Sequence, residues 1–175
     1  GYLGAAVLEE LKTHPGTCRL DCRLEEIPPR SLDCDVVIHC AGALRHRTSD
    51  LQKSNVEGMR SLLNGLKPGC RVLYVSSKSV YAKNHSESLT EQDAVDPFDD
   101  YGRSKREAEQ ILLSSGFSHL ILRSGNLFGL GVSDPGITFP SKAMQNFYSQ
   151  KEVVLRNPDI IHDYLYIRDL SRVIA

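Results

Sequence analysis

The sequence lacks a dominant sign of charge and any long apolar run. Its 175 residues carry a formal net charge of −1 at pH 7, so the chain presents no general electrostatic field for nucleic acid or an anionic membrane surface. No apolar run approaches the roughly 18 residues that a membrane-spanning helix needs. No signal-peptide pattern opens the chain. We therefore expect no nucleic-acid partner, no membrane association and a cytoplasmic location.

The sequence also lacks a regular arrangement of cysteine or histidine. The cysteines are odd in number, contain no C-x-x-C pair and lie mostly within apolar runs; they are Cys18, Cys22, Cys34, Cys40 and Cys70. This distribution argues against a disulfide framework or a zinc site and favours buried free thiols. The 6 histidines show no paired ligand spacing. The sequence therefore predicts no bound metal.

Helix-like and strand-like segments alternate along most of the chain. The near-continuous apolar runs "DVVIHCAG" (35–42) and "RVLYVSS" (71–77) are typical of strands covered on both faces of a parallel sheet. Helices are expected over 4–14, 50–66 and 98–115, and further short strands over 17–23 and 119–124. This alternation predicts an α/β fold with a doubly wound parallel sheet of the Rossmann type.

The character of the sequence changes after residue 128. The stretch 129–150 has glycine and proline breaks before a candidate helix at 140–149, and "KEVVLR" (151–156) is a candidate strand. Open α/β sheets bind ligands at their carboxyl edge, where such a loop-rich segment would lie. We therefore divide the chain into a sheet domain, 1–128, and a partial ligand-binding region interleaved with the sheet, 129–175.

The segment "YGRSK" places Tyr101 and Lys105 four residues apart at the start of a predicted helix, so their side chains lie on one face. A nearby cation lowers the cost of ionising a phenol from its usual pKa of about 10, and such a phenol can move protons near neutrality. The alternative is a tyrosine packed under a solvated lysine stem. Ser76 and Ser77 end a predicted strand, where these folds place functional side chains, although they are also suited simply to cap it.

The opening segment "GYLG" (1–4) begins the first predicted helix. Free amide groups and the helix dipole favour an anionic phosphate at such a position, and glycine lets the backbone approach it. A parallel α/β sheet normally opens with a strand, and none precedes this helix. We therefore expect that a first strand is missing from the chain.

Together these features resemble the extended short-chain dehydrogenase/reductases, and within them the NAD-dependent epimerase/dehydratase family that acts on nucleotide sugars. The similarity covers nearly the whole chain and depends on the order and spacing of several motifs. These motifs are "GYLG" (1–4), "DVVIHCAG" (35–42), "NVEG" (55–58), "VSSKSVYA" (75–82), "YGRSK" (101–105), "LRSGNLFGLG" (122–131) and "HDYLYIRDL" (162–170). The resemblance implies a dinucleotide-binding domain at 1–128, NAD or NADP as cofactor, and a nucleotide-linked sugar as substrate.

The resemblance also implies roles for individual residues. Tyr101 would exchange a proton with the substrate as hydride moves, and Lys105 would favour the phenolate and hydrogen-bond the nicotinamide ribose. Ser77 would bind the same substrate oxygen; it is preferred to Ser76 because it stands three residues before Val80, the family's usual offset. The cofactor-binding residues would be Gly1, Tyr2, Leu3, Gly4, Asp21, Cys40, Ala41, Gly42, Tyr101 and Lys105. The substrate-binding residues would be Ser77, Lys78, Ser79, Asn126 and His162.

Several of these assignments keep an alternative. Asp21 is equally suited to a solvated strand end, and Asn126 to ordinary turn chemistry. His162 stands where the family often has arginine, which puts one phosphate contact in question. The cluster Arg45-His46-Arg47 is suited to an anion or to a solvated loop. The chain between the first helix and "DVVIHCAG" is shorter than the family's, so the sequence does not choose between NAD and NADP.

The absence of an acidic pair after the predicted catalytic serine narrows the range of reactions that the resemblance implies. Sugar 4,6-dehydratases of the family carry an acidic pair directly after the catalytic hydroxyl, and here Lys78 and Ser79 take its place. This leaves 4-epimerisation or the net reduction of a 4-keto sugar. A non-catalytic dinucleotide-binding sensor or scaffold of the same fold is the alternative. The resemblance also implies a homodimer, with the helices 50–66 and 98–115 forming a four-helix bundle.

Overall fold

The structure is a computed structural model in two compact units. The smaller unit joins Gly1–Arg19 to Ser124–Ala175, and the larger unit is Leu20–Arg123. The residues described are 1–20, 23–43, 45, 48–82, 89–129, 139–154 and 163–175. The division of the chain at residue 128 into two functional regions stays a prediction.

The larger unit is built on a three-stranded sheet in the order β1-β2-β3. β1 and β2 run parallel, with Val36 opposite Arg71 and His39 opposite Tyr74. The predicted α/β fold with a parallel sheet is therefore confirmed. The strands are β1 (Val36–His39), β2 (Arg71–Ser77) and β3 (Ser118–Ser124).

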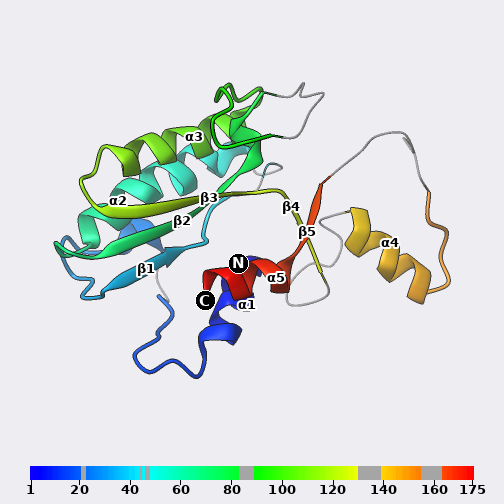
Figure 1. Cartoon of the computed structure of the whole chain (residues 1–175), viewed down its shortest axis with the longest axis horizontal. Coiled ribbons are helices and arrows are strands. Elements are labelled where there is room, and N and C mark those ends of the chain that lie inside the picture. Colours follow the sequence, from blue (N-terminus) through cyan, green and yellow to red (C-terminus); the bar gives the residue numbers. More distant parts are fainter. Residues whose placement is uncertain (21–22, 44, 46–47, 83–88, 130–138, 155–162) are drawn as a thin grey trace. The chain divides into compact units, whose positions relative to one another are not determined.

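Two helices, α2 (Gly58–Gly65) and α3 (Asp100–Leu113), lie side by side on one face of this sheet (Figure 1). Their apolar sides meet β2, and at about 25 cal/mol per Å² this burial is the main source of stability in the unit. The buried cluster between them consists of Met59, Leu63, Leu66, Cys70, Val72, Tyr74, Ala108 and Leu112. The packing fixes α3 against β2, the strand that ends at the predicted catalytic serine, Ser77.

The helix predicted over 50–66 is present but is not uniform. A 3-10 turn, Thr48–Asp50, leads into a π-helical segment, η3 (Gln52–Glu57), before α2 begins. Single π turns within helices occur frequently at functional sites. Here the π segment buries Asn55, whose exposed fraction is 2%.

Two predicted strands are not formed by the described residues. Residues 17–20 and 151–154 have no strand conformation, and all of them are exposed. Without a buried face or a neighbouring strand, a short segment that contains apolar residues does not form a stable β-strand.

The cysteines depart from the prediction of buried thiols. Cys70 is buried and Cys40 is half-buried, but Cys18 and Cys34 are exposed; all four are free. The Sγ atoms of Cys34 and Cys70 lie 3.4 Å apart, at the points where the chain enters β1 and β2. The expectation of burial was therefore wrong for Cys18 and Cys34.

In the smaller unit, α1 (Tyr2–Leu11) packs against α5 (Ile167–Ile174). The bounds of α1 are close to those of the first predicted helix, 4–14. A second, two-stranded parallel sheet joins β4 and β5, with Asn126 opposite Tyr164. The remaining elements are β4 (Asn126–Phe128), β5 (Tyr164–Tyr166) and α4 (Phe139–Tyr148). Within the described parts of the chain, every helix is too short or too polar to cross a membrane.

Candidate active site

Helix α3 carries the predicted tyrosine and lysine. Its start is fixed by Asp99, whose side chain accepts a hydrogen bond from the backbone N–H of Gly102 at 2.7 Å, as expected of an N-cap residue. Tyr101, Lys105 and Glu109 follow at intervals of four residues and therefore share one stripe of the helix. Lys105 and Glu109 are buried, so this stripe faces the interior of the unit.

Gly102 allows α3 to approach the chain that follows β2. A Cβ atom at this position would lie 2.1 Å from the carbonyl oxygen of Ser79 and 2.9 Å from Cβ of Pro97. No side chain fits in this space without a movement of the backbone. Glycine thereby lets Tyr101 come within reach of Ser77.

Ser77 ends β2 and begins the short 3-10 helix η4 (Lys78–Val80). Its Oγ accepts a hydrogen bond from the backbone N–H of Ser79 at 3.2 Å and lies 3.1 Å from Oγ of Ser79. The side chain of Ser77 also hydrogen-bonds that of Tyr101. The structure therefore brings together the serine and tyrosine that the sequence placed 24 positions apart.

The surroundings of Tyr101 act on its phenol in opposite directions. Burial raises the pKa of Tyr101 above its ordinary value, while the hydrogen bond from Ser77 and the charge of Arg45 lower it, and Asp99 raises it. The net direction is upward. This differs from the expectation drawn from the Tyr101–Lys105 spacing, because burial outweighs the favourable contacts.

Lys105 is 6% exposed and holds its ammonium at the carboxyl end of β2. The Nζ donates a hydrogen bond to the carbonyl oxygen of Val75 at 3.1 Å and lies 4.9 Å from the centre of the Tyr74 ring. Burial lowers the pKa of Lys105 to about 8, although Cys40 and Glu109 oppose this effect. The amine therefore titrates close to the physiological range.

The predicted cofactor turn follows β1 and passes beside this lysine. Gly42 has φ +156°, and a Cβ there would lie 2.6 Å from Oδ1 of Asn55 and 3.4 Å from Nζ of Lys105. Ala41 and Gly42 are exposed, whereas Cys40 is half-buried, and burial raises the pKa of its thiol to about 11. The turn thus offers an open backbone next to a buried cation.

Asn55 fixes this turn to α3. Its Oδ1 accepts a hydrogen bond from the backbone N–H of Ala43 at 2.8 Å, and its Nδ2 donates to Oγ of Ser104 at 2.9 Å. The Ser104 hydroxyl in turn donates to the carbonyl oxygen of Tyr101 at 2.8 Å. The π-helical segment therefore positions the two predicted site elements relative to each other.

The predicted substrate residues Lys78 and Ser79 lie on η4, directly after Ser77. Ser79 accepts a hydrogen bond from Nη2 of Arg45 at 2.7 Å. Burial lowers the pKa of Lys78, and the charge of Arg45 lowers it further. Two basic side chains therefore act on each other beside the serine.

The remaining predicted residues belong to the smaller unit or lie outside the described residues. Gly1, Tyr2, Leu3 and Gly4 form the start of α1, where Leu3 is buried and the hydroxyl of Tyr2 donates to the carbonyl oxygen of Gly129. The side chains of Tyr2 and Leu3 are thus engaged within their own unit, and only the backbone of "GYLG" remains a candidate for phosphate. A separate contact involves Asn126.

In that contact, Nδ2 of Asn126 donates to the carbonyl oxygen of Asp163 at 3.1 Å. This bond joins the first residue of β4 to the residue before β5. The predicted role of Asn126 at the substrate diphosphate stays a prediction. Asp21 and His162 lie outside the described residues.

Sequence reasoning missed a buried ionic cluster on the same helix stripe. Arg123 on β3 makes two hydrogen bonds to the carboxylate of Glu109, at 3.0 and 2.9 Å, and its Nη1 donates to the hydroxyl of Tyr81 at 2.7 Å. Arg106 adds a third contact to Glu109 at 3.3 Å. The spacing of Glu109 four residues after Lys105 was the available signal. The cluster secures α3 to β3 and to the chain beyond η4.

The larger unit therefore contains a tyrosine, two serines, a buried lysine and an open glycine turn around the carboxyl ends of β1 and β2. Such an arrangement suits proton transfer next to a bound cofactor. Among the described residues, no group of three or more histidine, cysteine or acidic side chains is placed to hold a metal ion.

Several solved structures share this fold. A UDP-N-acetylglucosamine 4-epimerase from Methanobrevibacter ruminantium, in complex with UDP-N-acetylmuramic acid, is 18% identical with a TM-score of 0.75, over 98% of this chain and 68% of its own. A dTDP-4-dehydrorhamnose reductase from Clostridium acetobutylicum is 22% identical with a TM-score of 0.79, over 98% and 65%. MoeE5 in complex with UDP-glucose and NAD is 21% identical with a TM-score of 0.81, over 99% and 67%.

These likenesses confirm the predicted fold class, and this chain spans about two thirds of the length of each of the three solved chains. A comparison with curated proteins found no match. The model of one protein family, described as the NAD dependent epimerase/dehydratase family, matches residues 5–175. The family resemblance drawn from the motifs is thereby confirmed, and the chain belongs to the NAD dependent epimerase/dehydratase family.

Proposed function

We propose that this chain is part of an enzyme that moves hydride between a nicotinamide dinucleotide and a nucleotide-linked sugar, as a 4-epimerase or a 4-ketoreductase. The observation that carries the proposal is the hydrogen bond between the side chains of Tyr101 and Ser77, on a helix that also buries Lys105. Membership of an NAD-dependent family supports the choice of cofactor.

NAD or NADP would lie over the turn after β1. The open backbone of Ala41 and Gly42, with the ammonium of Lys105 close to Gly42, suits the approach of a ribose. When bound, the dinucleotide would accept or donate the hydride.

Tyr101 would pass a proton to or from the reacting sugar oxygen, and Ser77 would hold that oxygen by a hydrogen bond. Its contact with Tyr101 supports this role because the two hydroxyl groups already converge. The raised pKa of Tyr101 means that the phenol starts protonated, which suits the donation of a proton to a 4-keto group. Lys105 would add a nearby positive charge.

The residues after Ser77 favour epimerisation or reduction over dehydration. Elimination of water from a sugar needs an acid and a base close to the ring. Lys78 and Ser79 supply an amine and a hydroxyl, with no carboxylate, at the positions of the family's acidic pair. At these identities the solved structures show the fold alone and do not choose between the two remaining reactions.

The proposal is tested by incubating the protein with NAD or NADP and a panel of UDP- and dTDP-linked sugars and their 4-keto forms. Products are separated by chromatography, and cofactor binding is measured by calorimetry. We expect an epimer or a reduced sugar from the wild type, and none from Tyr101→Phe, with cofactor binding retained. The matched control is Tyr148→Phe, since Tyr148 is 73% exposed on α4. Cofactor binding without turnover in the wild type would instead support a sensor or scaffold.

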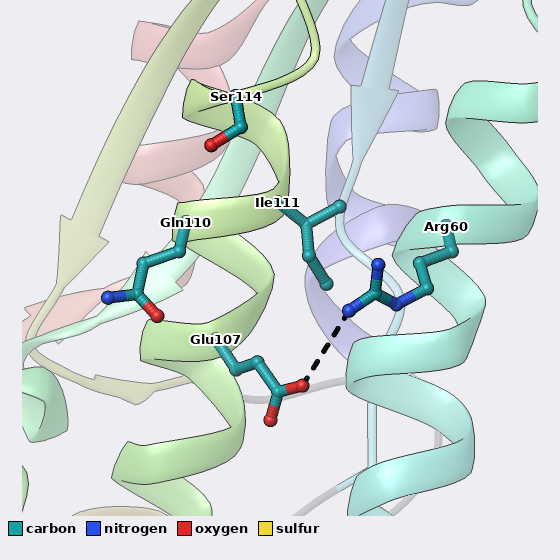
Figure 2. A pocket seen from close by; sticks show the side chains of 5 residues that line it. All are labelled: Arg60, Glu107, Gln110, Ile111 and Ser114. Carbon is teal, nitrogen blue, oxygen red and sulfur yellow. Dashed lines mark ion pairs between the residues drawn. The ribbon is translucent and has the colours of Figure 1, made fainter.

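The proposal extends to a homodimer that pairs α2 and α3 of two copies. A surface depression between these helices is lined by Arg60, Glu107, Gln110, Ile111 and Ser114, and an ion pair of 3.9 Å between Arg60 and Glu107 crosses it (Figure 2). We expect light scattering to give twice the chain mass. Ile111→Glu should reduce that mass to one chain, whereas Lys12→Glu on α1 should leave it unchanged. A single-chain mass in the wild type contradicts this part of the proposal.

A further inference from the structure

Arg45 contacts the predicted site from the turn after β1. Its Nη2 donates to Oγ of Ser79 at 2.7 Å, and its Nη1 lies 3.2 Å from Oδ2 of Asp99. The guanidinium carbon also lies 5.5 Å from the ring centres of both Phe98 and Tyr101. Arg45 is therefore contacted on three sides, although its side chain is 54% exposed.

These contacts connect Arg45 to the phenol of Tyr101 through two hydroxyl groups. Arg45 donates to Oγ of Ser79, Oγ of Ser77 also donates to Oγ of Ser79 at 3.1 Å, and Ser77 hydrogen-bonds Tyr101. When Tyr101 ionises, rotation of the two hydroxyl groups lets Ser77 donate to the phenolate and Ser79 donate to Ser77, and the charged donor Arg45 then strengthens this series.

We propose that Arg45 is a positioning residue of the proton relay: it orients the Ser79–Ser77 hydroxyl pair and stabilises the Tyr101 phenolate from above the ring. The inference depends on the proposed function for its catalytic meaning, but its physical content concerns only this chain. In the sequence, the basic cluster at Arg45 is compatible with an anion site or with a solvated loop.

Of the charged groups that act on Tyr101, Arg45 is the one that lowers the pKa of its phenol. Asp99, the N-cap residue of α3, raises that pKa. Lys105 directs its ammonium to Val75 and the Tyr74 ring.

From the strand side, burial keeps Tyr74 neutral by raising the pKa of its phenol. From η4, burial lowers the pKa of Lys78, and the charge of Arg45 lowers it further. Neither Tyr74 nor Lys78 is among the groups that lower the pKa of Tyr101, whereas the guanidinium of Arg45 is.

A direct role in binding an anionic ligand is the competing explanation. Both terminal nitrogens of Arg45 are engaged, one with Asp99 and one with Ser79. Each of these nitrogens keeps a second N–H and the side chain is 54% exposed, so the test has to separate anion binding from an effect on Tyr101. The position of the guanidinium carbon 5.5 Å from the centre of the Tyr101 ring is the expected geometry for a cation acting on that ring.

The test titrates Tyr101 directly, without substrate or cofactor. All tyrosines are replaced by 3-fluorotyrosine, whose lower pKa allows the titration to be followed by fluorine NMR before alkaline unfolding. The Tyr101 resonance is identified by its loss in Tyr101→Phe. The variants are Arg45→Gln and Arg45→Lys, and the matched control is Arg103→Gln. Arg103 has 56% side-chain exposure against 54% for Arg45, and it pairs with Asp100 at 2.7 Å.

We expect Arg45→Gln to raise the midpoint of Tyr101 by roughly half a unit to one unit, as for a charge about 5 to 6 Å away at a partly exposed site. Arg45→Lys should restore part of the difference, and Arg103→Gln should leave the midpoint unchanged. Circular dichroism at each pH confirms that the variants are folded.

An unchanged midpoint in folded Arg45→Gln would overturn the inference, and a weaker affinity for nucleotide sugar in that variant would then assign Arg45 to ligand binding. This result leaves the proposed function intact. Conversely, absence of turnover in the wild type would reject the proposed function without changing the titration result. The two failures are therefore distinguishable.

Discussion

Replacing Lys105 by methionine should stabilise the fold at neutral pH while removing a site residue. Burial lowers the pKa of Lys105 from 10.5 to about 8. At about 1.4 kcal/mol per pKa unit, holding the charged amine in the folded state costs about 3 kcal/mol. Methionine has a similar length and no charge, and it loses the hydrogen bond to Val75, worth about 1 kcal/mol, together with the contact of the ammonium with the Tyr74 ring. We expect a net gain of about 2 kcal/mol at pH 7.

The sign of this effect changes with pH in a defined window. Above pH 10.5 the amine is neutral in both states, and its burial carries no charge penalty. As pH falls from 10.5 to about 8, the unfolded chain binds a proton that the folded chain does not, so wild-type stability falls. Below pH 8 the penalty is complete and constant. The advantage of Lys105→Met should therefore disappear as pH rises toward 10.5.

Urea unfolding followed by circular dichroism at pH 7, 8, 9 and 10 measures this difference for the wild type and Lys105→Met. The matched control is Lys142→Met, because Lys142 is exposed on α4 and its charge stays in water. A constant difference between Lys105→Met and the wild type over this range would refute the burial argument. A pH-dependent difference in the control would assign the effect to the unfolded state.

Three further predictions concern the packing around the site. Gly102→Ala should cost about 1–3 kcal/mol in thermal unfolding, because the added methyl group meets a backbone carbonyl oxygen 2.1 Å away. Glu109→Ala should cost about 3 kcal/mol, since it leaves the guanidinium of Arg123 without its buried carboxylate. Oxidised glutathione should join Cys34 to Cys70, whose Sγ atoms are 3.4 Å apart, with a rate that increases with pH because burial raises the pKa of the Cys70 thiol to about 12.

Each of these predictions has a control within the chain. Gly58→Ala places its methyl group against the flexible end of Leu24 and should cost less than Gly102→Ala. Glu107→Ala removes a carboxylate of 43% exposure from the same helix and should stay within about 1 kcal/mol of the wild type. Peptide mapping by mass spectrometry should find Cys18 outside the disulfide. Equal effects in the paired variants, or random pairing of the thiols, would contradict the corresponding contact.

The local features of the site were predictable from sequence because they depend on short spacings. The i, i+4 relation of Tyr101 and Lys105 and the position of Ser77 at a strand end follow from helix and strand geometry. The raised pKa of Tyr101 was not predictable, because it arises from burial and from groups distant in sequence. The contacts of Arg45 were equally hidden, since a basic residue in a turn carries no signal of what it will pack against.

The strand predicted over 17–23 failed for a different reason. Alternation of apolar and polar residues indicates a strand only if a neighbouring strand and a buried face exist to receive it. Leu20 is 41% exposed, so its apolar side chain gains little from that conformation. The strand propensity of this segment is not sufficient, because no packing partner for it is present among the described residues.

The central claim, that Tyr101 relays a proton beside a hydride carrier, is tested most directly by absorbance at 340 nm. The protein is loaded with NAD or NADP in the oxidised form and mixed rapidly with each nucleotide sugar of the panel. A transient rise, from reduced cofactor, is predicted for the wild type with at least one sugar and is predicted to be absent from Tyr101→Phe. A rise of equal rate and size in Tyr101→Phe, or none in the wild type with any sugar, would contradict the account.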